Sequence, residues 1–276
     1  MLQPALPLHR EAATRATSRK DADGELRTVR VITENYRGMS YTVRRFTETG
    51  MLVGAAATEW VHRIRQNVLG DRPYLVALGG GRVFGDFLIA ATAQFQSLVV
   101  SPKNIEFFWG DERCVPPDHP DSNYRLAETA LLRPLGVAAS RIHRLRGEIV
   151  PDEAAAAAAA VLRAAAGVGA TEQPNLDLIF LGMGEDGHVA SLFPDGPAQE
   201  TKSPMVYLPV IGPKPPPQRL TLSYAAIAAA KEVWVIASGS GKQPALHESL
   251  GKDGNTPLGR VLRGRGHTTI FTDIPQ

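Results

Sequence analysis

The fold is decided by one stretch of sequence, Leu178-Ile179-Phe180-Leu181-Gly182-Met183-Gly184-Glu185-Asp186-Gly187-His188. Its apolar first part belongs to a run over residues 176–181 that is typical of a buried strand. The glycines that follow let the backbone turn sharply and approach a ligand closely. Asp186 and His188 lie at this turn, and ligands bind at the carboxyl ends of strands in α/β sheets. Histidine titrates near neutral pH and a carboxylate can fix its tautomer, so the stretch offers a chemical site, with a solvated glycine-rich turn as the alternative.

Strand and helix patterns alternate along the rest of the chain. Strands are expected at residues 41–46, 74–78, 105–109, 176–181, 206–210, 219–222, 233–237 and 268–272. Helices are expected at residues 51–69, 84–95, 122–132, 152–166 and 243–250. Such alternation predicts an α/β fold with a mostly parallel, doubly wound (modified Rossmann-like) sheet flanked by helices. We expect one domain over residues 39–276, preceded by a disordered N-terminal extension, residues 1–38, that lacks apolar periodicity.

Composition excludes several classes of protein. Hydrophobic residues make up 43% of the chain and charged residues 21%, as in ordinary soluble globular proteins. The net charge is only +2, and residues 1–38 hold seven basic and five acidic side chains, so the remainder is balanced. No basic face for nucleic acid and no membrane-spanning stretch of roughly 18 apolar residues is expected. The single cysteine, Cys114, fits a reducing compartment. We expect a cytoplasmic protein, and a monomer.

Three further blocks carry recognisable chemistry. They are residues 107–116, followed by His119 and residues 121–124; residues 214–222; and residues 239–242. Together with residues 182–194, and in this order, they resemble the 6-phosphogluconolactonases, which share a superfamily with the glucosamine-6-phosphate isomerase/deaminases. The resemblance runs from about residue 39 to the C-terminus. It implies hydrolysis of 6-phospho-D-glucono-1,5-lactone to 6-phosphogluconate in the oxidative pentose phosphate pathway, with a phosphorylated sugar lactone as partner and no cofactor or metal.

The resemblance also implies roles at the carbonyl of the lactone. We expect His188 to act as the general base that takes a proton from water, which typically contributes on the order of 10²–10⁴ in rate. Asp186 or Glu185 would orient His188, and Asp186 is favoured because the family pattern has Asp there. Gly187, which lies between them, is expected to bind substrate. Arg113 would hold the carbonyl oxygen and the product carboxylate, or it would pair internally with a neighbouring acid.

A phosphate site is expected where residues 74–78 end. Gly80, Gly81 and Arg82 form a strand-to-helix turn of the kind that presents backbone N–H groups to an anion. Position 84 is Phe, so the glycine fingerprint of a dinucleotide site is missing. The family has Thr-Pro where this chain has Val83-Phe84, which removes a hydroxyl. We hypothesise that Arg82, whose planar fork suits phosphate, compensates.

The remaining candidate binding residues follow the family pattern. Arg219 and Lys242 match its two other phosphate-directed cations, although a surface position is the usual fate of such residues. Asp111 and Glu112 precede Arg113 and would preposition its guanidinium. His119 and Asn123 would contact sugar hydroxyls or hold their loop, the second role being favoured. Lys214 precedes three prolines that stiffen its loop, and it would reach the substrate. The full set is Gly80, Gly81, Arg82, Asp111, Glu112, Arg113, His119, Asn123, Asp186, Gly187, His188, Lys214, Arg219 and Lys242.

Two alternatives stay open. An amino-sugar phosphate isomerase/deaminase moves a proton at C2 and needs further carboxylates around the histidine. The stretch Ser191-Leu192-Phe193-Pro194 offers no acid where that family has one. A non-catalytic sugar-phosphate-binding paralogue is the other alternative, motivated by Val83-Phe84. The sequence has no nucleophile elbow, zinc-protease motif or nucleotide P-loop.

Overall fold

The computed structural model describes residues 10–20, 26–36, 41–67, 72–196 and 205–275. Its main sheet has eight strands in the order β1-β2-β3-β11-β10-β7-β4-β5. The six strands from β3 to β5 all run parallel. Their bounds are Tyr41–Arg45 (β3), Thr268–Thr272 (β11), Glu232–Ala237 (β10), Leu178–Leu181 (β7), Tyr74–Leu78 (β4) and Ile105–Trp109 (β5). Each of these strands was expected from the sequence.

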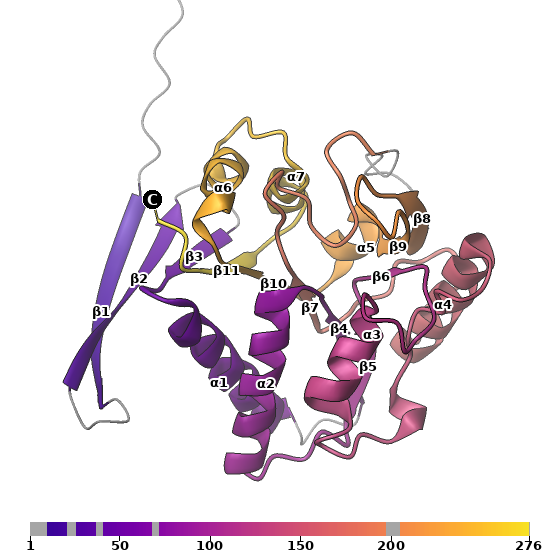
Figure 1. Cartoon of the computed structure of the whole chain (residues 1–276), viewed down its shortest axis with the longest axis horizontal. Coiled ribbons are helices and arrows are strands. Elements are labelled where there is room, and N and C mark those ends of the chain that lie inside the picture. Colours follow the sequence, from indigo (N-terminus) through magenta and orange to yellow (C-terminus); the bar gives the residue numbers. More distant parts are fainter. Residues whose placement is uncertain (1–9, 21–25, 37–40, 68–71, 197–204, 276) are drawn as a thin grey trace, which may run out of the picture.

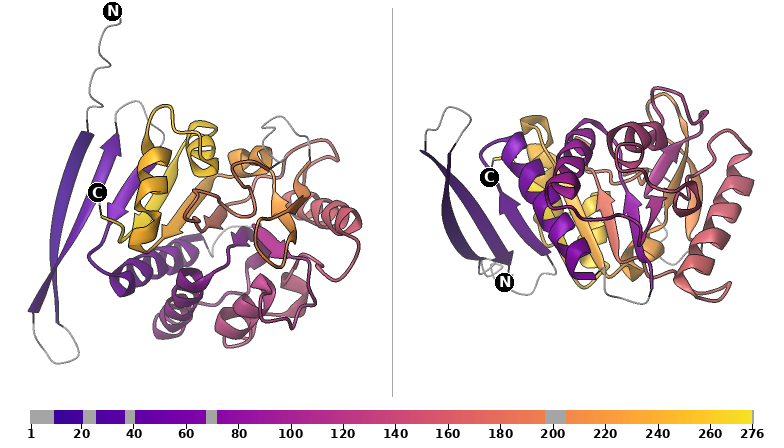
Figure 2. Two further views of the ribbon diagram at one scale, coloured as in Figure 1. Left: turned by 45° about the horizontal axis from the view of Figure 1, so that its top comes forward. Right: turned by 90° about the horizontal axis from the view of Figure 1, so that it is seen from below.

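Helices cover both faces of this sheet. In Figures 1 and 2, α1 (Thr49–Asn67) and α2 (Arg82–Ser97) lie on one face, and α6 (Gln243–Leu250) and α7 (Pro257–Arg263) lie on the other. The mostly parallel, doubly wound α/β fold is therefore confirmed. The first helix was expected to reach residue 69, but residues 68–71 lie outside the described part of the chain. None of the helices that the structure describes has the length and apolar character needed to cross a membrane.

One part of the core lies between the sheet and α1 and α2, and another lies on the opposite face, where α6 and α7 contribute buried residues such as Leu246 and Leu258. Apolar strands such as Leu178–Leu181 are buried on both faces, as is usual for strands in a parallel sheet. Phe180 projects from this strand into an aromatic cluster with Trp60 of α1 and Phe84 and Phe87 of α2. Phe84 is fully buried, with its ring centroid 5.6 Å from that of Phe180. The Phe that replaces the family's Pro is thus a core residue.

A second, three-stranded sheet lies beyond the carboxyl end of β5. Its antiparallel order is β6-β9-β8, with bounds Asp111–Arg113, Gln218–Leu222 and Tyr207–Ile211. Helix α4 (Pro151–Ala166) packs against β8 and β9. The sequence predicts β8 and β9 but not β6, which is only three residues long. The expected helix at residues 122–132 is α3 (Asn123–Ala127) continued by a π-helical turn, Glu128–Leu132.

The remaining short elements connect these layers. Helix α5 (Tyr224–Ala229) follows β9, and 3₁₀ turns occur at Ala139–Arg141 and Ser240–Lys242.

The structure differs from the sequence-based expectation at the N-terminus. Within residues 1–38, expected to be disordered, Arg10–Lys20 (β1) and Leu26–Tyr36 (β2) form an antiparallel hairpin. β2 then pairs antiparallel with β3 and extends the sheet, as Figure 1 shows. The physical reason is that β3 would otherwise be an open edge, and β-branched residues are frequent in Leu26–Tyr36. Residues 1–9, 21–25 and 37–40 lie outside the described part, and a domain boundary at residue 39 stays a prediction.

Candidate active site

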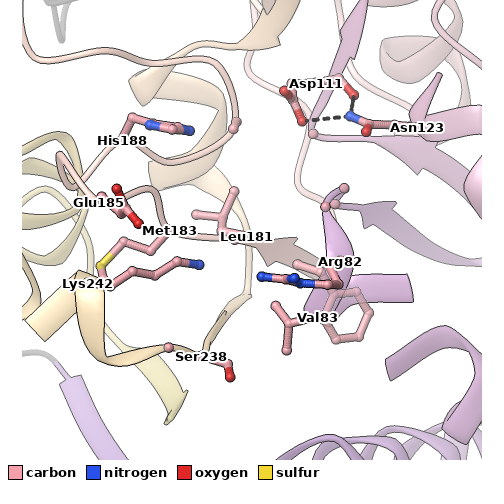
Figure 3. A pocket seen from close by; sticks show the side chains of 18 of the residues that line it. Arg82, Val83, Asp111, Asn123, Leu181, Met183, Glu185, His188, Ser238 and Lys242 are labelled. Carbon is pink, nitrogen blue, oxygen red and sulfur yellow. Dashed lines mark hydrogen bonds between the residues drawn. The ribbon is translucent and has the colours of Figure 1, made fainter. Parts of the chain in front are cut away.

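One cavity of about 540 Å³ opens at the carboxyl ends of β4, β7 and β10. It extends toward the start of the small sheet, where Asp111, Arg113 and Arg219 line it. Figure 3 shows His188, Asp111, Arg82 and Lys242 around this space. The cavity is therefore where a parallel α/β sheet is expected to bind its ligand. Among the described residues, no group of three or more His, Cys, Asp or Glu side chains is arranged to hold a metal ion.

His188 and Asp186 form a hydrogen-bonded pair at the rim of the cavity. Nδ1 of His188 lies 2.5 Å from Oδ1 of Asp186, and the backbone N–H of His188 donates to the same oxygen over 3.1 Å. The imidazole also packs on Phe193, with ring centroids 4.9 Å apart. Because Nδ1 is engaged by Asp186, Nε2 is the ring nitrogen left to the ligand.

Two glycines make this pairing possible. A Cβ at Gly184 would lie 2.1 Å from Nδ1 of His188, so the ring rests directly on the backbone of that residue. Gly187 has a φ of +78°, and a Cβ there would lie 2.7 Å from Cβ of Thr256. Gly187 was expected to bind substrate, but it does not line the cavity. Its place between the two functional side chains is that of a turn residue.

The charge state of Asp186 suits its pairing with His188. Burial raises the pKa of Asp186, but the charge of His188 and its two hydrogen bonds outweigh burial, so this pKa lies below its usual value. The carboxylate is thus ionised at neutral pH and accepts the bond from the imidazole. An imidazole that donates from Nδ1 to a carboxylate presents a lone pair at Nε2.

Arg82 begins α2 and Lys242 ends the 3₁₀ turn after β10, and the two side chains point toward one another across the cavity in Figure 3. Neither side chain forms a hydrogen bond or an ion pair within the described residues. Burial lowers the pKa of Lys242 and the nearby Arg82 lowers it further, whereas the carboxylates of Glu185 and Asp273 oppose the shift. Gly81 is the N-cap residue of α2, and because glycine has no side chain, it accepts no hydrogen bond from the first N–H groups of the helix. Two cations therefore line the cavity beside the N-terminus of α2, a position suited to binding an anion.

Arg113 and Arg219 form a second pair of cations, on the small sheet. They are register partners on β6 and β9, and their mutual repulsion adds to burial in lowering the pKa of Arg219. Arg219 donates from Nε to the carbonyl of Pro216 (3.1 Å) and from a terminal nitrogen to that of Lys214 (3.2 Å). Arg113 donates to the carbonyl of Asp121 over 2.7 Å. The structure thus places Arg219 beside Arg113 and Lys242 beside Arg82.

Asp111 and Asn123 link the two sides of the cavity. The carboxylate of Asp111 accepts a hydrogen bond from Oγ of Ser191 (2.7 Å) and one from the amide of Asn123 (3.2 Å). The amide of Asn123 also covers Gly80, where a Cβ would lie 2.0 Å from Oδ1 of Asn123. Gly80 is therefore required for Asn123 to lie at the cavity wall.

Besides Gly187, three of the expected binding residues lie outside the cavity lining. Glu112 is buried and accepts backbone N–H bonds from Arg113, Asn123 and Tyr124, each 2.8 Å long. Burial raises the pKa of Glu112 although these bonds oppose the shift. His119 accepts from the backbone N–H of Asp121 (3.1 Å), and Lys214 is exposed. These side chains hold loops or face solvent in this structure.

Sequence reasoning missed part of the site. Thr49 and Ser238 line the cavity, and both donate hydrogen bonds to Asp273. Single hydroxyl residues carry little signal in a sequence. Thr49 begins α1 and Ser238 directly follows β10. These positions were the only feature of the sequence that could have indicated a place in the site.

Comparison with known proteins identifies the family. Residues 47–270 match the family described as glucosamine-6-phosphate isomerases/6-phosphogluconolactonase. The chain belongs to this family. Over 217 residues it is 36% identical to the 6-phosphogluconolactonase of Mycobacterium tuberculosis, covering 77% of this chain and 87% of the relative. It is 33% identical over 231 residues to that of Streptomyces coelicolor, covering 81% and 88% of the two chains.

Solved structures of the glucosamine-6-phosphate isomerase/6-phosphogluconolactonase family agree with the fold. The 6-phosphogluconolactonase of Trypanosoma brucei superposes with a TM-score of 0.76 at 26% identity, covering 85% of this chain and 97% of that one. A monomeric glucosamine-6-phosphate deaminase superposes with a TM-score of 0.71 at 17% identity, covering 85% and 97%, which shows the shared fold alone. The resemblance to 6-phosphogluconolactonases that the sequence motifs indicated is confirmed.

Proposed function

We propose that the protein hydrolyses 6-phospho-D-glucono-1,5-lactone to 6-phosphogluconate, with His188 as general base. The observation that carries the proposal is that the His188–Asp186 pair shares one cavity with the cations Arg82, Arg113 and Lys242. Lactone hydrolysis needs an activated water near the carbonyl, and a phosphorylated substrate needs cations some distance from it. The relatives named 6-phosphogluconolactonase support this choice of substrate.

In the proposed reaction, Nε2 of His188 takes a proton from water while the water oxygen bonds to C1 of the lactone. The carbonyl electrons move onto oxygen, where Arg113 stabilises the developing charge. When the tetrahedral intermediate collapses, the bond from C1 to the ring oxygen breaks. The imidazolium of His188 then returns its proton to this departing oxygen, and the product is the open-chain acid. Asp186 keeps the imidazole in the required tautomer throughout.

The phosphate would lie between Arg82 and Lys242, at the N-terminus of α2. Charge-assisted hydrogen bonds from an arginine fork and an ammonium are stronger than neutral ones. The half-buried ammonium of Lys242 has no anionic partner at hydrogen-bond distance within the described residues, so an entering phosphate would satisfy it. Arg82 directly precedes Val83, which replaces the family's Thr, and would compensate for the missing hydroxyl.

The test is a coupled assay in which glucose-6-phosphate dehydrogenase generates the lactone, and its disappearance is corrected for spontaneous hydrolysis. We expect His188→Ala to lower kcat by about 10²–10⁴-fold. His247→Ala, which removes an exposed histidine of α6, is the matched control and should behave as wild type. Clearance of lactone by His188→Ala at the wild-type rate would refute the general-base role.

The same preparation tests the deaminase alternative. Ser191 lies three residues beyond His188, and its hydroxyl donates to Asp111, so residues 191–194 supply no carboxylate. Proton transfer at C2 of an amino sugar would lack that acid. We expect no ammonia release from glucosamine 6-phosphate. Steady ammonia release would reverse the order of the two proposals.

A further inference from the structure

Asp273 lies just behind the cavity, after the last strand of the sheet. One carboxylate there receives three hydrogen bonds from two other parts of the chain. Oδ2 accepts from Oγ1 of Thr49 (2.6 Å) and from Oγ of Ser238 (2.7 Å), and Oδ1 accepts from the backbone N–H of Gly239 (3.1 Å). Asp273 therefore joins the start of α1, the end of β10 and the end of β11 at one point.

These bonds fix the turn that carries Lys242. Gly239 has a φ of +106°, a conformation that glycine adopts without a steric penalty, and its carbonyl accepts the backbone N–H of Lys242 over 3.1 Å. The turn contains two glycines, Gly239 and Gly241, so its own sequence does little to restrict it. Asp273 supplies the restraint from outside the turn, because it binds both the Ser238 side chain and the Gly239 backbone.

The hydroxyls around Asp273 are also oriented by it. Thr49 and Ser238 line the cavity, and their oxygens lie 3.0 Å apart. Because both direct their protons to Asp273, they offer only lone pairs to the cavity, next to the ammonium of Lys242. These two hydroxyls therefore give an anion no hydrogen bond, so the binding of a phosphate at this wall depends on Lys242.

We propose that Asp273 is a positioning residue for the phosphate group of the substrate: it holds the residue 238–242 turn so that Lys242 reaches the phosphate. The inference rests on the proposed function, since it takes the ligand of Lys242 to be a phosphate. Asp273 does not line the cavity, so it acts through Lys242 and not by contact with substrate. A second effect points the same way, because its charge helps to keep the half-buried Lys242 protonated.

The experiment is a titration of 6-phosphogluconate by calorimetry into wild type, Asp273→Asn, Lys242→Ala and the double variant. We expect Asp273→Asn to weaken binding about tenfold (about 1.4 kcal/mol) and to raise KM for the lactone similarly. It should leave kcat within about twofold, since the carbonyl end is untouched. In the Lys242→Ala background, Asp273→Asn should change affinity by less than about twofold, as expected for residues that act as one unit.

The matched control is Asp177→Asn, which removes a carboxylate with a similar number of hydrogen bonds at the opposite end of the sheet. It should lower the thermal midpoint without changing the affinity for 6-phosphogluconate. Should Asp273→Asn not fold, Thr49→Val removes one of the three contacts at nearly constant shape. Because Thr49 itself lines the cavity, this variant is measured with and without Lys242→Ala, and it should weaken binding only where Lys242 is present.

Each outcome is decisive. Unchanged affinity in Asp273→Asn, or an equal loss with and without Lys242, would overturn the positioning role while leaving the proposed function intact. Wild-type affinity in Lys242→Ala would instead refute the phosphate assignment itself.

Discussion

At the scale of single residues, the site depends on side chains that lie against bare backbone. The His188 ring rests on Gly184, and the Asn123 amide rests on Gly80, at distances that no Cβ would permit. The sequence showed these glycines, and it showed Asp186 and His188 two residues apart. It did not show which backbone atoms the side chains would cover, because that depends on loops from different strands.

The sequence also did not indicate which cations would lie beside one another. Arg219 and Lys242 belong to the same expected class, yet one lies beside Arg113 and the other beside Arg82. Spacing along the chain carries no information about this division, since the small sheet that brings Arg113 and Arg219 together forms from segments about 100 residues apart. The members of the site were largely predictable, but their grouping was not.

A substitution of Arg219 tests whether this cation binds the phosphate, as proposed for Arg82 and Lys242, or acts at the carbonyl, as proposed for Arg113. We expect Arg219→Ala to raise KM for the lactone about tenfold with a smaller change in kcat, because the family pattern assigns this residue to the phosphate. Steady-state kinetics over a range of lactone concentrations measures both constants. A collapsed kcat at unchanged KM would refute simple phosphate binding and would place Arg219 with Arg113 at the carbonyl.

At the scale of elements, sequence periodicity located the six parallel strands and the main helices within a few residues. It failed at β6, because three residues are too few for a pattern, at the short helices α5 and α7, and at the β1–β2 hairpin. Charged residues in Arg10–Lys20 and Leu26–Tyr36 obscured the alternation of apolar and polar residues that predicts a strand. In addition, β2 covers the edge of β3, and the sequence does not reveal that edge because it exists only in the folded sheet.

The N-terminus of α2 provides the element-scale prediction. Val83 lines the cavity where the family has Thr, while Phe84 is buried in the aromatic cluster. We expect Val83→Thr to lower KM for the lactone by up to about tenfold, because it adds one hydroxyl donor for a charged acceptor at nearly constant volume. Lactonase kinetics measures the change. Val83→Ala is the control that alters volume without adding a donor, and an equal KM in Val83→Thr and Val83→Ala would contradict the prediction.

At the scale of the whole molecule, the two ends of the sheet differ in their charges. The carboxyl ends hold the cavity with Arg82 and Lys242, which form no ion pair within the described part of the chain, whereas Asp177 at the amino ends has several partners. It accepts from Arg72, from Lys231 (2.8 Å) and from the backbone N–H of Leu75 (2.9 Å). Each partner lies just before a central strand: Arg72 before β4, Asp177 before β7 and Lys231 before β10. One carboxylate therefore joins the starts of three central strands.

Asp177 should therefore control stability without affecting catalysis. Burial raises the pKa of Asp177, but the bonds from Arg72, Lys231 and Leu75 outweigh burial, so the folded-state pKa lies below its usual value. A carboxyl group with a lowered folded-state pKa stabilises the protein above its unfolded pKa of about 3.9, and this contribution is lost as pH falls through the folded-state pKa. Asp177→Asn should lower the free energy of unfolding by about 2 kcal/mol at pH 7, the cost of hydrogen bonds to a charged group.

Urea unfolding from pH 7 down to pH 3 measures this contribution. The difference in the free energy of unfolding between wild type and Asp177→Asn should stay constant down to about pH 4. Below that pH it should shrink, because the Asp177 carboxylate of the wild type becomes protonated. Lactonase kcat and KM of the variant should match wild type, because Asp177 lies at the end of the sheet opposite the cavity. A stability difference that persists unchanged at pH 3 would show that the effect of the substitution is one of packing, and a changed KM would show that the two ends of the sheet are coupled.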